Sequence, residues 1–157
     1  MFTKFLTVFL VSMLPLAELR VAVPLAVGMK LPLVASYIIC IIGNMIPVPF
    51  IYFFARKVLE WGAEKPILEK PFTWILKKGE KGGEKLMEKV GRSTYVALFL
   101  FVGIPIPGTG AWTGTLAASI LDLDFKKSVL AALGGVLLAG IIMGVASTGV
   151  FSLIGLV

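Results

Sequence analysis

The sequence lacks the residues on which many enzyme and metal sites depend. It has no histidine and a single cysteine, Cys40, in 157 residues, so an internal disulfide is impossible and the commonest general base and zinc ligand is missing. Its apolar regions contain no close pair of carboxylates, and the chain has neither a nucleophile elbow nor a phosphate-binding lysine loop. We therefore expect neither an enzyme nor a bound metal or cofactor.

Charged residues are also scarce, and they are unevenly distributed. They make up 15% of the chain against 58% hydrophobic residues, and of the 15 basic and nine acidic residues 16 lie between Arg56 and Arg92. This composition is too apolar for a soluble domain of this size and predicts an integral membrane protein. The net charge of +6 comes largely from the central segment and its borders. We expect that segment to face anionic lipid headgroups rather than nucleic acid.

Four apolar regions are present, and they are of two kinds. Residues 31–55 and 128–157 are uncharged runs of 25 and 30 residues, long enough to cross a hydrocarbon core of about 30 Å. The other two regions, residues 1–30 and 94–121, are broken near the middle, and their arms of about 9 to 13 residues are too short to cross alone. Each broken region is therefore either one kinked span or a re-entrant hairpin.

The distribution of basic residues favours hairpins. Hairpins place the central segment, Lys126 and Lys127 on one side of the membrane, against only Lys4 and Lys30 on the other, as the positive-inside rule requires. The fold class that we predict is an all-α integral membrane protein of two inverted repeats, each a re-entrant helical hairpin plus a transmembrane helix. The single membrane domain, 1–157, then comprises repeat 1 (1–55), a charged amphipathic cytoplasmic linker (56–93) and repeat 2 (94–157), in the cell membrane.

Glu18 and Arg20 are the most informative residues of the first broken region. An ionised side chain at the bilayer centre costs about 2.5 to 3.5 kcal/mol even on the lenient insertion scale, so both need partners or water. Positions i and i+2 do not face each other on a helix, so either the backbone is unwound here or each residue meets another segment. Glu18 could carry a proton, and Arg20 could bind a phosphate or carboxylate. Alternatively, the two form a salt bridge that only fixes the hairpin tip.

The second broken region contains a proline and glycine turn, residues 105–110. A helix starting near Ala111 would direct its free N–H groups toward the midplane, which predicts an anion site. Tight helix packing is the alternative for Gly110 and Gly114. Asn44, with Pro47 and Pro49 after it, marks a polar kink that could face the same cavity, although an interhelical hydrogen bond is its more usual role. The candidate substrate or ion-binding residues are thus Glu18, Arg20, Asn44, Pro105, Pro107, Gly108, Thr109, Gly110, Trp112 and Thr113.

The stretches ELRVAVPLAVGMKLP (18–32) and FVGIPIPGTGAWTG (101–114) resemble the small multidrug export family of bacterial and archaeal membrane proteins, which looks related to the DedA, or VTT-domain, superfamily. The resemblance implies two inverted repeats of hairpin and span. For the superfamily it implies ion-coupled movement of lipids such as polyprenyl phosphate carriers. By position, Glu18 matches the acidic residue of the first hairpin, and residues 105–110 match the proline turn of the second. DedA proteins usually carry arginine in that turn, which this chain lacks.

These observations predict a membrane transporter with its site between two hairpin tips. The leading hypothesis is proton- or ion-coupled flipping of an anionic lipid, such as a polyprenyl phosphate carrier. A proton-coupled small multidrug exporter of cations is the alternative, and a non-transporting membrane scaffold is a third reading. The partners that we expect are the lipid bilayer, an anionic lipid or small-molecule substrate, protons or sodium as the coupling ion, and a second copy of the chain in a homodimer.

Overall fold

The computed structural model describes residues 1–15, 17–66, 70, 73, 74, 77, 94–153 and 155. In this part of the chain the regular structure is helical, without strands. The elements are α1 (Phe2–Met13), α2 (Glu18–Gly28), α3 (Leu33–Met45), α4 (Pro47–Phe50), the π-helix η1 (Ile51–Ala55), α5 (Arg56–Ala63), α7 (Thr94–Gly103), α8 (Ala111–Ile120) and α9 (Phe125–Leu153). Most of the amphipathic linker predicted at 56–93 lies outside the described residues.

Two helical stretches among the described residues are long and apolar enough to cross a membrane, as the sequence predicted. They are Leu33–Phe54 and Phe125–Leu153. The second begins three residues before the uncharged run, because Asp124 caps it: the Lys127 N–H donates to Asp124 Oδ1 at 2.9 Å. The four helices of the broken regions have 10 to 12 residues, or about 15 to 18 Å, so none of them spans a bilayer alone.

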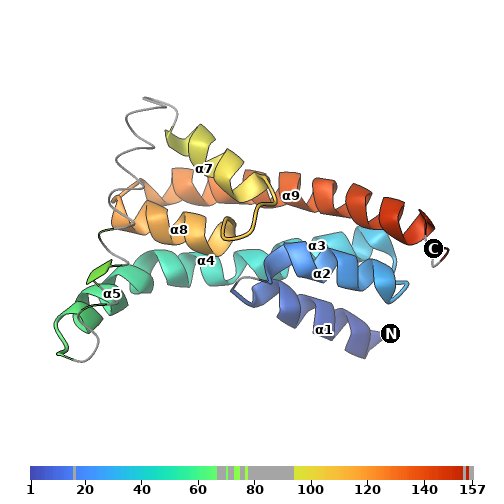
Figure 1. The fold of residues 1–157 in the computed structure, drawn as a ribbon, viewed down its shortest axis with the longest axis horizontal. Helices are drawn as coiled ribbons and strands as arrows, with labels where there is room; N and C mark the ends of the chain where they lie inside the picture. Colours follow the sequence, from blue (N-terminus) through green and yellow to red (C-terminus); the bar gives the residue numbers. More distant parts are fainter. Residues whose placement is uncertain are drawn as a thin grey trace.

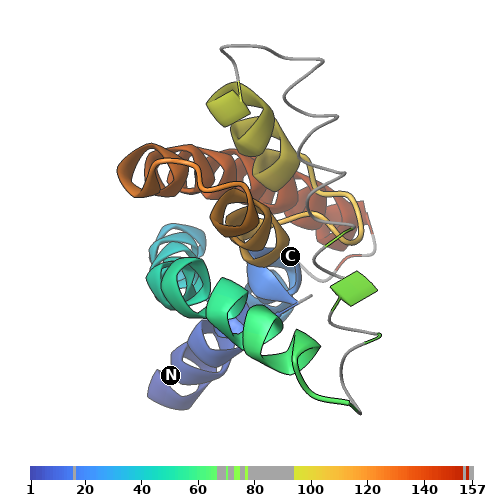
Figure 2. The same ribbon diagram turned by 90° about the vertical axis from the view of Figure 1, so that its left-hand side faces the viewer.

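The two broken regions each fold back on themselves. Figure 1 shows α1 running from the N-terminus to the middle of the molecule and α2 returning beside it. From the opposite end, α7 runs to the middle and α8 returns. The long helices α3 and α9 run in opposite directions, while α1 and α7 lie on opposite faces of the bundle (Figures 1 and 2). The chain reversals therefore meet near the centre of the molecule.

The two halves share a plan that repeats after 92 residues. Helices α1 and α7 begin at Phe2 and Thr94, and α3 and α9 begin at Leu33 and Phe125, 92 residues apart in both cases. Both returning helices also end alike. Lys30 (φ 58°) and Asp122 (φ 51°) adopt the left-handed conformation, and the N–H of the leucine that follows each donates to the carbonyl five residues earlier, at 3.0 Å. The same type of turn thus leads into each long helix.

Glycines at equivalent positions set the packing of the long helices. A Cβ atom at Gly43 would lie 2.8 Å from the carbonyl oxygen of Phe9 in α1, and one at Gly135 would lie 2.7 Å from the carbonyl oxygen of Phe99 in α7. Both distances are well inside van der Waals contact. Each long helix therefore approaches the first helix of its own half closely because a side chain is missing there.

Prolines shape the far end of the first long helix. Pro47 and Pro49 cannot donate the usual backbone hydrogen bonds, and the next residues, Ile51–Ala55, form a wider π-helical turn. This turn is fixed to the end of α8: Ser119 Oγ donates to the Tyr52 carbonyl at 2.6 Å, and the Tyr52 hydroxyl donates to the Leu123 carbonyl. The bent helix consequently forms one wall of a pocket beside α8.

Candidate functional site

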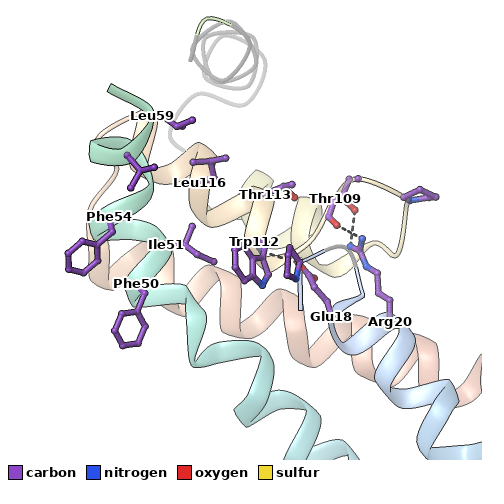
Figure 3. A pocket seen from close by; sticks show the side chains of 14 residues that line it. Glu18, Arg20, Phe50, Ile51, Phe54, Leu59, Thr109, Trp112, Thr113 and Leu116 are labelled. Carbon is purple, nitrogen blue, oxygen red and sulfur yellow. Dashed lines mark hydrogen bonds between the residues drawn. The ribbon is translucent and has the colours of Figure 1, made fainter. Parts of the chain in front are cut away.

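A pocket of about 720 Å³, here called the tip pocket, lies where the two chain reversals meet. Figure 3 shows Glu18 and Arg20 from the first reversal facing Thr109 and Trp112 from the second, with α4, η1 and α5 completing the wall. The lining is mostly apolar. Its side chains are those of Pro15, Glu18, Arg20, Phe50, Ile51, Phe54, Val58, Leu59, Pro107, Thr109, Trp112, Thr113 and Leu116, together with the backbone of Gly108.

Glu18 is the first residue of α2, and its carboxylate caps a different helix. It accepts hydrogen bonds from the backbone N–H groups of Ala111, at 3.2 Å to Oε2, and Trp112, at 3.0 Å to Oε1. These are two of the free N–H groups at the start of α8, where the helix dipole also favours a negative charge. Glu18 is only 5% exposed and has a φ of 50°, uncommon for a residue other than glycine. The N–H groups for which the sequence predicted an anion thus donate to a side chain of the protein itself.

Gly110 makes this approach possible. It has a φ of 140°, and a Cβ atom here would lie 2.7 Å from Glu18 Cδ. Glycine is therefore required by backbone conformation and by space at the same position. Gly110 therefore allows the close approach of Glu18 rather than the packing of two helices. Gly114 has the packing role, because a Cβ atom there would lie 2.8 Å from Val102 Cγ2 in α7.

Arg20 binds the end of α7 and the turn that follows it. Its guanidinium donates to the carbonyl oxygens of Val102 (3.2 Å), Ile104 (3.1 Å), Ile106 (2.7 Å) and Thr109, and to Thr109 Oγ1 at 2.8 Å. Carbonyls at a helix C-terminus lack intrahelical partners and carry the negative end of the dipole, so a cation fits there.

The side chains of Glu18 and Arg20 therefore both hydrogen-bond to the second reversal. The sequence left open whether the backbone is unwound here or each residue meets another segment, and both occur. Glu18 has a positive φ, outside helical geometry, and the hydrogen-bond partners of both side chains lie in the second half of the chain. The N–H groups of α8 and the carbonyls of the preceding turn are satisfied by opposite charges only two residues apart. This arrangement places a buried carboxylate and a guanidinium at one wall of the pocket.

Trp112 also joins the second reversal to the first. Its indole Nε1–H donates to the Met13 carbonyl at 3.1 Å, at the end of α1. Thr109 Oγ1 is within hydrogen-bonding distance of the Ile106 carbonyl at 2.8 Å, and Thr113 Oγ1 lies 3.4 Å from the Gly110 carbonyl. Trp112 consequently contacts the first reversal through both its backbone and its side chain.

Most of the candidate residues line the tip pocket, but three do not. Gly110 lies outside the lining and contacts Glu18 instead. Asn44 is 2% exposed within α3 and does not line the tip pocket, and its Oδ1 has no hydrogen-bond partner among the described residues. Pro105 also lies outside the pocket lining. Sequence reasoning missed the apolar wall from the bent helix, Phe50, Ile51, Phe54, Val58 and Leu59. The sequence did mark a kink at Pro47 and Pro49, which leads into this wall, but it did not single out the apolar side chains that follow.

The comparisons with known proteins give a family. A family model described as "Putative small multi-drug export protein" matches residues 18–142, most of the chain, including Glu18, Arg20 and the whole of the second reversal. No curated protein and no solved structure matches. The two long apolar helices agree with the membrane location that the family name implies. The chain therefore belongs to the small multi-drug export protein family.

Proposed function

We propose that this protein is a membrane transporter that moves an amphipathic anion, such as a lipid with a phosphate headgroup, through the tip pocket, and that protonation of Glu18 is coupled to the movement. The observation that carries the proposal is the carboxylate of Glu18 on the N-terminal N–H groups of α8. The N–H groups of Ala111 and Trp112 bind a carboxylate directly, and they border a pocket with apolar walls.

The architecture supporting this proposal is a pair of inverted repeats in the membrane. The two folded-back helix pairs enter from opposite ends of the molecule, and their helices are too short to span (Figure 1). The non-helical turns between them contact each other through the hydrogen bonds of Glu18, Arg20 and Trp112, and they border the tip pocket. Irregular backbone is tolerated at membrane depth where it is buried in protein or lines a water-filled cavity. In this arrangement the protein would lie in the cell membrane with the tip pocket near the midplane, and the central segment, residues 56–93, would face the cytoplasm.

The coupling follows from competition for one position. When Glu18 is ionised, its carboxylate satisfies the N–H groups of Ala111 and Trp112. When Glu18 takes up a proton, it becomes a poorer acceptor, and the positive end of α8 together with Arg20 favours an anionic headgroup instead. Proton and anion would then bind together, and the apolar wall would contact the hydrocarbon part of the substrate.

A second candidate, exchange of a lipophilic cation for the Glu18 proton, is favoured by a specific observation. The two terminal nitrogens of Arg20 already donate to four backbone carbonyls and one hydroxyl, whereas each carboxylate oxygen of Glu18 accepts one backbone hydrogen bond and can accept more. Aromatic side chains that can contact a cation, Phe50, Phe54 and Trp112, line the same pocket. The family description, which names drug export, agrees with this candidate.

Transport by purified protein in liposomes tests the proposal. The probe is a fluorescent lipid with a phosphate headgroup, whose transfer between leaflets is followed by a membrane-impermeant quencher. We expect Glu18→Gln to slow the transfer by about tenfold or more, the result of adding about 1.4 kcal/mol to a barrier. Glu64→Gln is the matched control, because Glu64 is exposed and lies outside the tip pocket.

The outcomes separate the candidates. If phosphate lipid moves and Arg20→Ala impairs its transfer, the anion candidate holds. If no lipid moves and uptake of a lipophilic cation requires Glu18 but not Arg20, the cation candidate holds. If folded wild-type protein moves neither probe, the scaffold reading holds. Unchanged transport in folded Glu18→Gln protein contradicts the site assignment in either case.

A further inference from the structure

A second pocket, of about 810 Å³, lies on the other side of the contact between the two reversals. This terminal-side pocket is formed by α1 and the junction of α3 and α4, with Thr7 as the polar residue and no charged residue in its described lining. In Figure 1, α1 extends from the contact toward the N-terminus, whereas α5, which lines the tip pocket, extends to the opposite end. The two pockets therefore lie on opposite sides along the length of the helices.

The pockets share three lining residues, Pro15, Phe50 and Trp112. Of the two large side chains in this common wall, Phe50 is 63% exposed at the outside of the molecule, whereas Trp112 is only partly exposed and lies between Glu18 and Ile51 (Figure 3). Its indole is held across the first reversal by the hydrogen bond to the Met13 carbonyl. Trp112 is thus the side chain best placed to separate the two pockets.

Trp112 also connects this wall to the proposed binding position. Its backbone N–H donates to Glu18 Oε1, and its indole N–H donates to the end of α1. A headgroup that replaces the Glu18 carboxylate on α8 would remove one of these two bonds. The residue that forms the barrier would then respond to occupancy of the anion position.

We propose that the two pockets are successive binding sites for the same amphipathic substrate, and that the indole of Trp112 is the barrier between them. The terminal-side pocket would take the apolar chain of the substrate, because its described lining carries no charge. This inference rests on the proposed function. Displacement of the indole joins the pockets into one path past the reversals.

Sided labelling of single cysteines tests the barrier without any substrate. In a Cys40→Ala background, Thr113→Cys reports on the tip pocket and Thr7→Cys on the terminal-side pocket; both threonines are partly exposed. A charged, membrane-impermeant thiol reagent is added to vesicles on the side of residue 64. We expect rapid labelling of Thr113→Cys and slow labelling of Thr7→Cys, and the reverse when the reagent is added on the side of the N-terminus.

Removal of the indole should abolish this difference. We expect Trp112→Ala to raise the rate at Thr7→Cys from the residue 64 side by at least about tenfold, and to leave the rate at Thr113→Cys unchanged. Trp112→Phe keeps an aromatic ring but loses the hydrogen bond to the Met13 carbonyl, so it should give an intermediate labelling rate at Thr7→Cys. If Trp112→Ala does not fold, Trp112→Phe tests the barrier in its place. Equal labelling from both sides in the wild type, no labelling of either cysteine, or unchanged rates in the Trp112 variants would each overturn the inference.

The labelling and the transport assay fail independently. If the protein carries neither the phosphate lipid nor the cation, the proposed function is lost although the sided pattern can persist. If it carries one of them while Trp112→Ala leaves the labelling pattern intact, only the barrier assignment is lost.

Discussion

The two chain reversals occupy equivalent places in the repeat, yet they present opposite chemistry to each other. Glu18 and Gly110, which are 92 residues apart, stand at the start of the two returning helices. The first reversal offers a carboxylate and a guanidinium, whereas the second offers bare N–H and carbonyl groups. At the far ends of the same helices, the turns at Lys30 and Asp122 are alike.

This difference teaches how charged residues can be accommodated in an apolar bundle. A chain that turns in the middle of a bundle leaves helix termini unsatisfied, and each terminus carries a partial charge. Here the charges of one half satisfy the helix termini of the other half. The two halves are therefore alike in the packing of their long helices and differ at the contact between the reversals.

The largest loss of stability is expected from placing a side chain at Gly110 in the second reversal. Gly110→Ala combines a backbone conformation that costs about 1 to 3 kcal/mol in other residues with a clash against Glu18. We expect a large fall in the thermal unfolding temperature of the protein in detergent, and loss of the contact between Glu18 and the start of α8. Gly108→Ala is the matched control, because Gly108 has a φ of 84° but nothing within 4 Å of an added Cβ, so it should cost only about 1 to 2 kcal/mol. Equal losses in the two variants would contradict the close approach of Glu18.

The next effect concerns the cation of the first reversal. Arg20→Lys keeps the charge but replaces a planar fork by a single ammonium, which cannot reach all the acceptors between Val102 and Thr109. Loss of hydrogen bonds to a charged group predicts destabilisation by about 1.5 to 3 kcal/mol, measured by thermal unfolding. Lys65→Arg, at an exposed position outside both pockets, should leave stability unchanged. A fully stable Arg20→Lys protein would show that charge alone suffices.

A paired substitution tests the equivalence of the two halves in their packing. Gly43→Ala and Gly135→Ala each place a Cβ within 3 Å of a carbonyl oxygen in the neighbouring helix. Overpacking of this kind costs about 1 to 3 kcal/mol, and we expect similar losses at both positions in thermal unfolding. Gly144→Ala, with nothing within 4 Å of the added atom, serves as the control. A large loss at one position and none at the other would break the equivalence.

The smallest effect is expected within the turn. Thr109→Val removes the hydroxyl that Arg20 binds at 2.8 Å, so it should cost about 0.5 to 1.5 kcal/mol. Thr113→Val removes only a contact of 3.4 Å to the Gly110 carbonyl and should cost less. The reverse order, measured under the same unfolding conditions, would argue against the role of Thr109 in holding Arg20.

The sequence predicted the helical regions and their breaks because these depend on local composition. Uncharged runs revealed the two long helices, and the prolines and glycines of residues 105–110 revealed the second reversal. The cost of unpaired charges in an apolar environment singled out Glu18 and Arg20.

The hydrogen-bond partners of Glu18 and Arg20 could not be predicted from the neighbouring sequence. Arg20 donates to carbonyls more than 80 residues away, and nothing in the spacing of Glu18 indicates which backbone N–H groups it meets. Backbone groups carry no sequence signal, because every residue except proline has both an N–H and a carbonyl. The apolar wall of the tip pocket was hidden for a related reason: its side chains are those of any membrane-facing helix.

The most direct test of the central claim is the pH dependence of anion binding by the tip pocket. The ligand is a lipid with a phosphodiester headgroup, whose own charge does not change over the range measured. Because protonated Glu18 leaves the start of α8 free, we expect wild-type binding to strengthen as the pH falls, and Glu18→Gln to bind equally well at every pH. Binding that strengthens as the pH rises in the wild type, or a pH dependence that persists in Glu18→Gln, would contradict the account.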